Sequence, residues 1–208
     1  MSASSNTSPK PGKLIVVSGP SGVGKSSVVD GVLAHPGAVF SVSATTREAR
    51  PCEFDGEDYF FVDEAGFDEL ITDGRLLEWA EYGGHRYGTP RDSVLDHLAA
   101  GEHVVLDIEN HGAHQVKKAY PDAVLVFILP PSLEELQRRL RSRGDTSEES
   151  ILRRLSVAAE QIDDATATFD HVVVNDDLET AISQVVSILW GPTPTGDPVG
   201  ASGDDTEE

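Results

Sequence analysis

Residues 19–26 read Gly-Pro-Ser-Gly-Val-Gly-Lys-Ser, and this run constrains the fold more than any other segment. It fits G-x-x-x-x-G-K-[ST] in full, and it stands between an apolar run at 14–17 and a helical pattern at 26–34. Glycines let successive backbone N–H groups curve around an anion, and the helix adds free N–H groups and its positive dipole end. The segment predicts a loop that binds the phosphates of a nucleoside triphosphate. A structural glycine-rich turn is the alternative.

The side chains of this loop have separate expected roles. Lys25 supplies a cation for the β- and γ-phosphates, and the hydroxyl of Ser26 is a ligand for Mg²⁺. Asp107 ends an apolar strand, where a carboxylate orients Mg²⁺ or its waters, and a solvated acid at a strand end is the alternative. The loop residues predicted to bind ATP are Gly19, Pro20, Ser21, Gly22, Val23, Gly24, Lys25, Ser26 and Ser27.

Short apolar runs alternate with helical patterns along most of the chain. The predicted strands cover residues 14–17, 39–42, 104–107, 123–129 and 172–174. The predicted helices cover residues 26–34, 114–120, 133–143, 148–162 and 178–190. Ser132 and Glu135 have the spacing of a capping box at the start of one helix. This alternation predicts an α/β fold with a central parallel sheet and helices on both of its faces.

Residues 43–97 interrupt the alternation. Short strands are predicted at 57–62, 76–82 and 85–87, and helices at 63–72 and 91–99. We interpret this segment as a small mixed α+β insertion with its own ligand pocket. The two ends of the chain are rich in small and polar residues, so they cannot bury enough apolar surface to offset the entropy of ordering. We therefore expect disordered tails at residues 1–12 and 191–208, the second of them acidic.

The charge balance limits the classes of partner. The chain has 36 acidic residues against 16 Lys and Arg, a formal net charge of −20, which argues against nucleic-acid binding. No apolar run approaches the roughly 20 residues that span a bilayer, and the N-terminus lacks the apolar segment of a secretory signal. A single cysteine, Cys52, rules out an internal disulfide and suits a reducing compartment. We expect a cytoplasmic protein without membrane or nucleic-acid partners.

Seven further motifs resemble those of the guanylate kinase family, and the resemblance covers residues 12–189. They are SATTREAR at 43–50, DYFFV at 58–62, EWA at 78–80, YGT at 87–89, DIE at 107–109, RG at 143–144 and VNDD at 174–177. The resemblance implies a P-loop kinase with a core, a GMP-binding insertion and a mobile helical lid. It implies phosphoryl transfer from ATP to GMP, and to dGMP, with Mg²⁺ as cofactor. The predicted parts are the core at 13–42, 98–135 and 156–190, the insertion at 43–97 and the lid at 136–155.

By this resemblance four side chains hold the GMP phosphate: Arg47, Arg50, Tyr59 and Tyr87. Their chemistry suits the role, because two guanidinium groups grip phosphate in bidentate fashion and two phenols donate to it. The alternatives are that the arginines pair with Glu48 or Glu53 and that the tyrosines are ordinary strand aromatics.

The base of GMP needs a different set of contacts. Guanine presents N1–H and N2–H₂ as adjacent donors, and one carboxylate accepts from both. By the resemblance Glu78 is that carboxylate, and Ser43 and Thr89 contact O6 and N2; an exposed strand acid is the alternative for Glu78. The chain has Glu109 where the family commonly has Asp, and His111 where it has Gln. The predicted GMP site also includes Gly88, Asp107 and Glu109.

Six of the 16 basic residues lie in the predicted lid: Arg138, Arg139, Arg141, Arg143, Arg153 and Arg154. In so acidic a protein this concentration indicates an anion site. By the resemblance Arg139 and Arg143 reach ATP, Arg154 approaches the transferring group, and Asn175 lies beside adenine. The other three arginines are expected to form salt bridges on a solvated helix face.

The catalytic set predicted from these observations is Lys25, Arg47, Arg139, Arg143 and Arg154. No general base is assigned, because the GMP phosphate is already largely ionised at neutral pH. Three rival functions are a P-loop phosphotransferase for another small phosphate, a binding module that has lost catalysis, and a regulatory NTPase switch. The guanine-reading set disfavours the first, and the intact Lys25 and Ser26 disfavour the second. The pair Arg47 and Arg50 and the arginine-rich lid disfavour the third. We expect a monomer or a small homo-oligomer.

Overall fold

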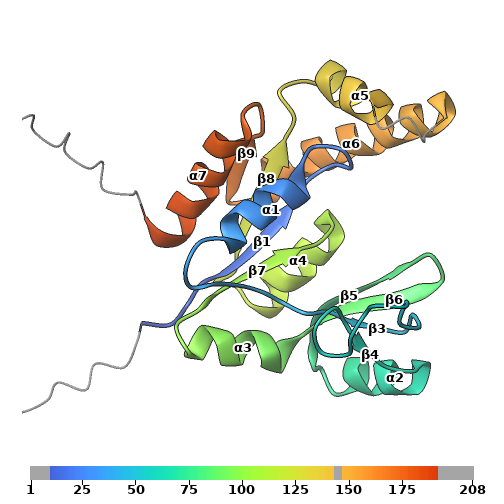
Figure 1. Ribbon diagram of the computed structural model, residues 1–208, viewed down its shortest axis with the longest axis vertical. Helices are drawn as coiled ribbons and strands as arrows, with labels where there is room; N and C mark the ends of the chain where they lie inside the picture. The colour runs from blue at the N-terminus through green and yellow to red at the C-terminus, as the bar shows by residue number, and fades with distance from the viewer. Residues whose placement is uncertain (1–9, 143–146, 192–208) are drawn as a thin grey trace, which may run out of the picture.

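The computed structural model describes residues 10–142 and 147–191. The predicted tails therefore lie outside the described residues, except for residues 10–12 and 191, and so do Arg143 and Gly144. The described chain forms a five-stranded sheet and a four-stranded sheet with helices packed around them (Figure 1). None of the helices among these residues is long and apolar enough to cross a membrane.

The larger sheet is parallel throughout, as the alternation of strands and helices predicts. Its strands lie in the order β2-β7-β1-β8-β9. Their bounds are β1 Leu14–Ser18, β2 Ala38–Phe40, β7 His103–Asp107, β8 Val124–Leu129 and β9 His171–Val174. All five residues of β1 are buried, because this strand has a neighbour on each side and helices over both faces.

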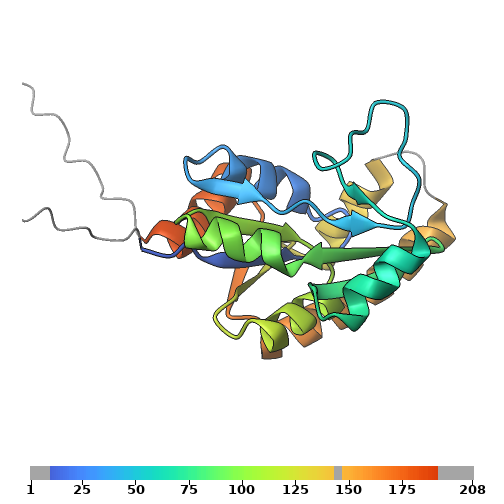
Figure 2. The same cartoon turned by 90° about the horizontal axis from the view of Figure 1, so that it is seen from below.

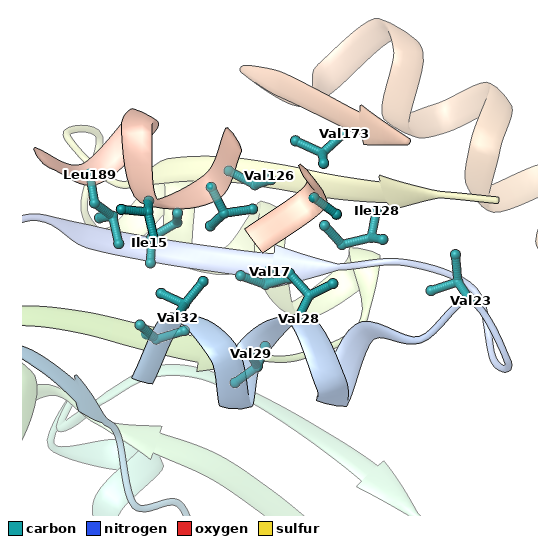
Figure 3. Close-up of a cluster of buried hydrophobic side chains, with 14 residues drawn as sticks. Ile15, Val17, Val23, Val28, Val29, Val32, Val126, Ile128, Val173 and Leu189 are labelled. Atoms are coloured by element: carbon teal, nitrogen blue, oxygen red, sulfur yellow. The ribbon is translucent and has the colours of Figure 1, made fainter. Parts of the chain in front are cut away.

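Successive residues of β1 face two separate cores. Ile15 and Val17 join a cluster with α1 (Lys25–Leu33) and α7 (Leu178–Trp190), which Figure 3 shows on one side of the sheet. Leu14 and Val16 join a cluster on the other side with α3 (Arg91–Ala99) and α4 (Asn110–Ala119). Strands β1 and β7 pair in parallel between these two layers of helices, so their carboxyl ends, at Val17 and Asp107, lie beside each other.

The smaller sheet belongs to the insertion. Its strands lie in the order β4-β3-β6-β5, with bounds β3 Ala44–Thr45, β4 Phe60–Phe61, β5 Leu76–Tyr82 and β6 His85–Pro90. Helix α2 (Glu64–Thr72) covers it by packing Phe67 against Ala44 and Leu76. The strand predicted at 57–62 is limited to β4, and β3 was not predicted. Although α3 begins inside the predicted insertion, it packs on β7 through Val94 and Leu98.

Two helices form an arm beside the core. Helices α5 (Leu133–Ser142) and α6 (Glu148–Thr168) pack together through Leu136, Leu140 and Ile151. The backbone N–H of Glu135 donates to the hydroxyl of Ser132 at 3.1 Å, as the capping spacing predicts. Helix α6 continues to residue 168, beyond its predicted end at 162, and runs back along α4 (Figure 2). Buried Ala165 shows that this extension packs on the core.

Candidate active site

The phosphate loop connects β1 to α1, as predicted. Gly24 has φ +95°, and a Cβ there would lie 2.5 Å from Nδ2 of Asn175, so only glycine fits. No side chain caps the start of α1, so its first N–H groups are free to meet an anion. The loop lines a cavity of about 250 Å³. Its lining residues are Gly19, Pro20, Ser21, Gly22, Gly24, Lys25, Ser26, Ser27 and Glu109.

Lys25 and Asp107 meet at the ends of neighbouring strands. The Nζ of Lys25 lies 2.5 Å from Oδ1 of Asp107, because Asp107 pairs in register with Val17 at the end of β1. The exposed hydroxyl of Ser26 and the carboxylate of Asp107 are oxygen donors of the kind that Mg²⁺ prefers. In the described parts of the chain no three His, Cys, Asp or Glu residues form a metal cluster. A small number of protein ligands is the usual arrangement for Mg²⁺, because substrate phosphates and water provide most of its coordination.

Val23 provides an anchor for the back of the loop. Its carbonyl oxygen accepts a hydrogen bond from Nδ2 of Asn175 at 2.8 Å and another from Nη1 of Arg139 at 3.1 Å. Arg139 also donates to the carbonyl oxygen of Asn175 and to the carboxylate of Glu135. Two residues predicted to contact ATP therefore support the loop from behind in this structure. Hydrogen bonds from Arg138 and Arg139 lower the pKa of Glu135 to about 2.

A second cavity, of about 320 Å³, lies between the insertion and the core. It contains six of the residues predicted to bind GMP: Ser43, Tyr59, Glu78, Tyr87, Asp107 and Glu109. Because Asp107 ends β7 and Glu109 follows it, the cavity adjoins the phosphate loop, and Glu109 lines both cavities. Two substrates bound in them would approach each other beside Lys25.

Glu78 lies at the inner wall of this cavity. It is 6% exposed, and the hydroxyl of Thr89 donates to its Oε1 at 2.7 Å. Burial raises the pKa of Glu78, and the hydrogen bond from Thr89 opposes that rise. A Cβ on Gly112 would lie 2.9 Å from Oε2 of Glu78, so this glycine leaves space for the carboxylate. The site therefore contains a largely buried carboxylate that accepts hydrogen bonds from Thr89 and lines the cavity.

The predicted phosphate grip is built around Arg47. Glu53 accepts from both of its terminal nitrogens, at 2.9 and 3.0 Å, and this contact matches the ion pair considered as the alternative. The ring of Tyr59 lies 5.3 Å below the guanidinium carbon, and Tyr87 meets Tyr59 edge to face at 6.0 Å. Hydrogen bonds from Arg47 hold the pKa of Glu53 below its usual range. The side chain of Arg50 is 73% exposed and lies 3.9 Å from Glu53.

The arginines of the arm fall into two groups. Arg138, Arg141 and Arg153 form salt bridges with Glu135, Glu148 and Glu149, which confirms the prediction of a solvated, paired helix face. Arg154 lines a cavity of about 200 Å³ together with Ser21 of the phosphate loop and Glu109, and Arg153 also borders this cavity. Arg143, predicted to contact ATP, lies outside the described residues.

Several residues of the second cavity were not predicted as site residues: Ala80, Tyr82, Ile108, His111 and Gly112. The alternation of β5 is the signal for two of them, since Ala80 and Tyr82 lie on the same face as Glu78.

A larger surface hollow, of about 680 Å³, lies between β9 and α7. It has no Lys or Arg in its lining, so it is poorly suited to phosphate.

The sequence and the fold are similar to those of known proteins. The sequence matches the family model described as guanylate kinase over residues 11–191. A guanylate kinase of Thermosynechococcus vestitus is 50% identical over 190 residues, which are 91% of this chain and 99% of that protein. One of a Synechococcus species is 52% identical over 175 residues, 84% of this chain and 93% of that protein. The crystal structure of guanylate kinase from Anaplasma phagocytophilum matches with a TM-score of 0.66 at 36% identity, covering 87% of this chain and 86% of that one. The chain therefore belongs to the guanylate kinase family and is a nucleoside monophosphate kinase.

Proposed function

We propose that this guanylate kinase binds ATP at the phosphate loop and GMP, or dGMP, in the cavity around Glu78, and forms ADP and GDP or dGDP. The observation that carries the assignment of the base site is Glu78 itself, a buried carboxylate with one hydroxyl donor at 2.7 Å. Guanine N1–H and N2–H₂ supply two further donors to this carboxylate and favour its ionised form. Adenine presents an unprotonated ring nitrogen to the same oxygen, so its binding leaves a buried acceptor unpaired.

The GMP phosphate is assigned to Arg47, Arg50, Tyr59 and Tyr87. The support for this assignment is that the guanidinium of Arg47 lies over the ring of Tyr59 and already holds a carboxylate in bidentate fashion, a geometry that a phosphate can adopt in place of the carboxylate. In this proposal Glu53 gives way to the phosphate, and exposed Arg50 closes over it.

The chain stabilises the transferring group without a general base. The GMP phosphate has a second pKa near 6, so its attacking oxygen is largely ionised at neutral pH. Lys25 and the N–H groups of the loop meet the β- and γ-phosphates, while Arg154, which lines the cavity beside Ser21, faces the group in transfer. Ser26 and Asp107 would hold Mg²⁺, which when bound neutralises charge on the phosphate oxygens. Arg139 and Arg143 are assigned to the ATP side of the closed arm.

We assign the protein to the cytoplasm, as a monomer or small homo-oligomer that needs no nucleic acid or membrane. The exposed free thiol of Cys52 suits a reducing compartment. The division into a core, an insertion at 43–97 and a lid at 136–155 belongs to the same proposal. The packing of α3 on β7 favours ending the insertion before Arg91.

The test is a coupled assay of ADP release from MgATP with GMP, dGMP, AMP, CMP, UMP or no acceptor. We expect strong turnover with GMP and dGMP, and little with AMP. Glu78→Gln should lower the preference for GMP over AMP by about 10²-fold or more, because the amide presents a donor where the carboxylate accepted. Glu81→Gln is the matched control, since Glu81 is an exposed acid on the same strand. An unchanged preference in Glu78→Gln would refute the base-reading role, and GMP binding without turnover would indicate a binding module.

A further inference from the structure

A polar network with a buried centre joins three elements that meet behind the active site. Its centre is Asn110, the first residue of α4, which is 8% exposed. The hydroxyl of Ser18, the last residue of β1 before the phosphate loop, donates to Oδ1 of Asn110 at 3.0 Å. The Nδ2 of Asn110 donates to the carbonyl oxygen of Gln161 at 3.1 Å and to Oδ2 of Asp164 at 3.0 Å. Both of these acceptors belong to α6, the helix that carries Arg154.

The chemistry of the network requires an amide at position 110. Its two partners on α6 are acceptors, so the NH₂ group must face them, and its oxygen then meets the hydroxyl of Ser18. An apolar side chain would leave the buried hydroxyl of Ser18 without this partner, at a cost of about 1–3 kcal/mol, while Asp164 is partly exposed and keeps His114. The amide can pair with Ser18 and with both acceptors of α6 in one arrangement of these elements, so the network favours that arrangement.

Two further contacts strengthen the junction. Asp164 also pairs with Nε2 of His114 at 2.9 Å, one turn further along α4. The side chain of Gln161 donates to Oε2 of Glu109 at 3.0 Å, and Glu109 lines the cavities assigned to both substrates. Four hydrogen bonds therefore connect two residues of α6 to residues 109–114.

The position of Arg154 follows from this junction. Residues 154, 157, 161 and 164 are spaced i, i+3, i+7 and i+10, so they share one face of the helix. Arg154, Val157 and Gln161 all line the cavity beside Ser21, and Arg153 lines it from the neighbouring position. Asp164 lies ten residues from Arg154, which is about 15 Å along the axis. Rotation of the helix by one residue, about 100°, would move Arg154 from its present place and put a neighbouring residue there.

We infer that Asn110 and Asp164 are positioning residues, which fix the rotation of α6 so that Arg154 faces the phosphate loop. The expected effect of these residues on turnover rests on the proposed role of Arg154, whereas their effect on the position of α6 does not. The network itself contacts neither substrate cavity except through Gln161 and Glu109. It couples the arm to β1, the strand that leads directly into the phosphate loop.

The first experiment is a double-mutant cycle of Asn110→Ala and Arg154→Ala, with kcat and both KM values measured. We expect each single variant to lower kcat by about 10-fold or more, and the double variant to match Arg154→Ala within about 2-fold. Asp164→Ala should repeat the effect of Asn110→Ala. Asp164→Asn keeps an oxygen for Asn110 and should retain kcat within about 3-fold. Asp163→Ala is the matched control, because Asp163 is the exposed neighbour on the same helix.

The second experiment measures the arm directly. Spin labels at Leu152→Cys on α6 and Asp30→Cys on α1, both exposed positions, report the distance between arm and core in a Cys52→Ser background. Asn110→Ala should broaden or shift the distance distribution, while Asp163→Ala should not. Thermal unfolding of each variant shows whether the variant still folds. If an alanine variant does not fold, the distance distribution of Asp164→Asn is compared with that of the wild type.

The outcomes separate the positioning role of Asn110 and Asp164 from the proposed role of Arg154 in turnover. An unchanged distance distribution in both Asn110→Ala and Asp164→Ala would overturn the positioning role. So would a double variant whose kcat falls by the product of the two single effects, because the two residues would then act independently. A changed distance with unaffected turnover in Arg154→Ala would support the positioning role and refute the proposed role of Arg154.

Discussion

The turn at residues 50–53 offers a prediction that can be worked out from the backbone. The N–H of Glu53 donates to the carbonyl oxygen of Arg50 at 3.0 Å, Pro51 occupies the second position and Cys52 the third. Cys52 has φ +80°, the one positive φ at a non-glycine residue in the described chain. A type II turn requires this conformation at its third position, where glycine is strongly preferred. We therefore expect Cys52→Gly to stabilise the protein.

The magnitude follows from two opposing terms. The left-handed conformation costs a side chain with a Cβ about 1–2 kcal/mol, which glycine avoids. Glycine in turn makes the unfolded chain more flexible, which costs about 0.5–1 kcal/mol. Because Cys52 is exposed, its thiol contributes little packing. The net gain is about 0.5–1 kcal/mol, which corresponds to a rise in Tm of about 1–4 °C for a domain of this size.

Differential scanning calorimetry measures this rise, and urea unfolding provides an independent value. Cys52→Ser is the matched control, because it removes the thiol but keeps the Cβ and the strained backbone. It should leave Tm unchanged within about 1 °C. Equal stabilisation by Ser and Gly would show that the thiol, and not the backbone, is responsible. A lower Tm in Cys52→Gly would refute the reasoning, since the strain would then not be relieved by glycine.

Two further predictions concern Lys25 and His103. Lys25→Ala should lower kcat by at least about 10²-fold in the coupled assay, because it removes a cation that faces the transferring phosphoryl group, and near-normal turnover would contradict that role. The exposed Lys118 provides the control variant Lys118→Ala. Burial lowers the pKa of His103, so the folded protein binds fewer protons at this residue than the unfolded chain does. The neutral His103 therefore contributes its full stabilisation above the ordinary pKa near 6.5, and this stabilisation is lost as the pH falls below that value. The urea midpoint should therefore fall less between pH 7.5 and 5.5 in His103→Gln than in the wild type, and an equal fall would show that His103 does not contribute.

Local patterns in the sequence were sufficient for much of the fold. The phosphate loop needs a strand, a glycine-rich turn and a helix in direct succession, and residues 14–34 contain all three. The buried parallel strands are recognisable as continuous β-branched runs, so the central sheet and the family membership were predicted correctly. The small strand β3 was missed because Ala44 and Thr45 form a two-residue strand, which is too short for any periodic pattern.

The rest depends on contacts between distant residues. Nothing near Asn110 indicates that its amide meets Asp164, which is 54 residues away in the sequence. The extension of α6 beyond residue 162 has the same origin, because the residue that ties it to α4 is the polar Asp164, which gives no apolar pattern. The roles assigned to individual site residues, such as Arg139, stay predictions, and Arg143 lies outside the described chain.

The pairs Lys25–Asp107 and Arg47–Glu53 give each of these two cations a counter-ion that is tethered to the same chain. A tethered carboxylate acts at a high effective concentration, on the order of millimolar or above, so a dilute monoanion such as chloride or acetate exchanges with it poorly. A phosphate dianion has more charge and more acceptor oxygens, and it also meets the free N–H groups or the phenols nearby. In a protein with a net charge of −20, ion exchange at these two pairs thus gives the few cations a preference for phosphate over the common anions of its surroundings.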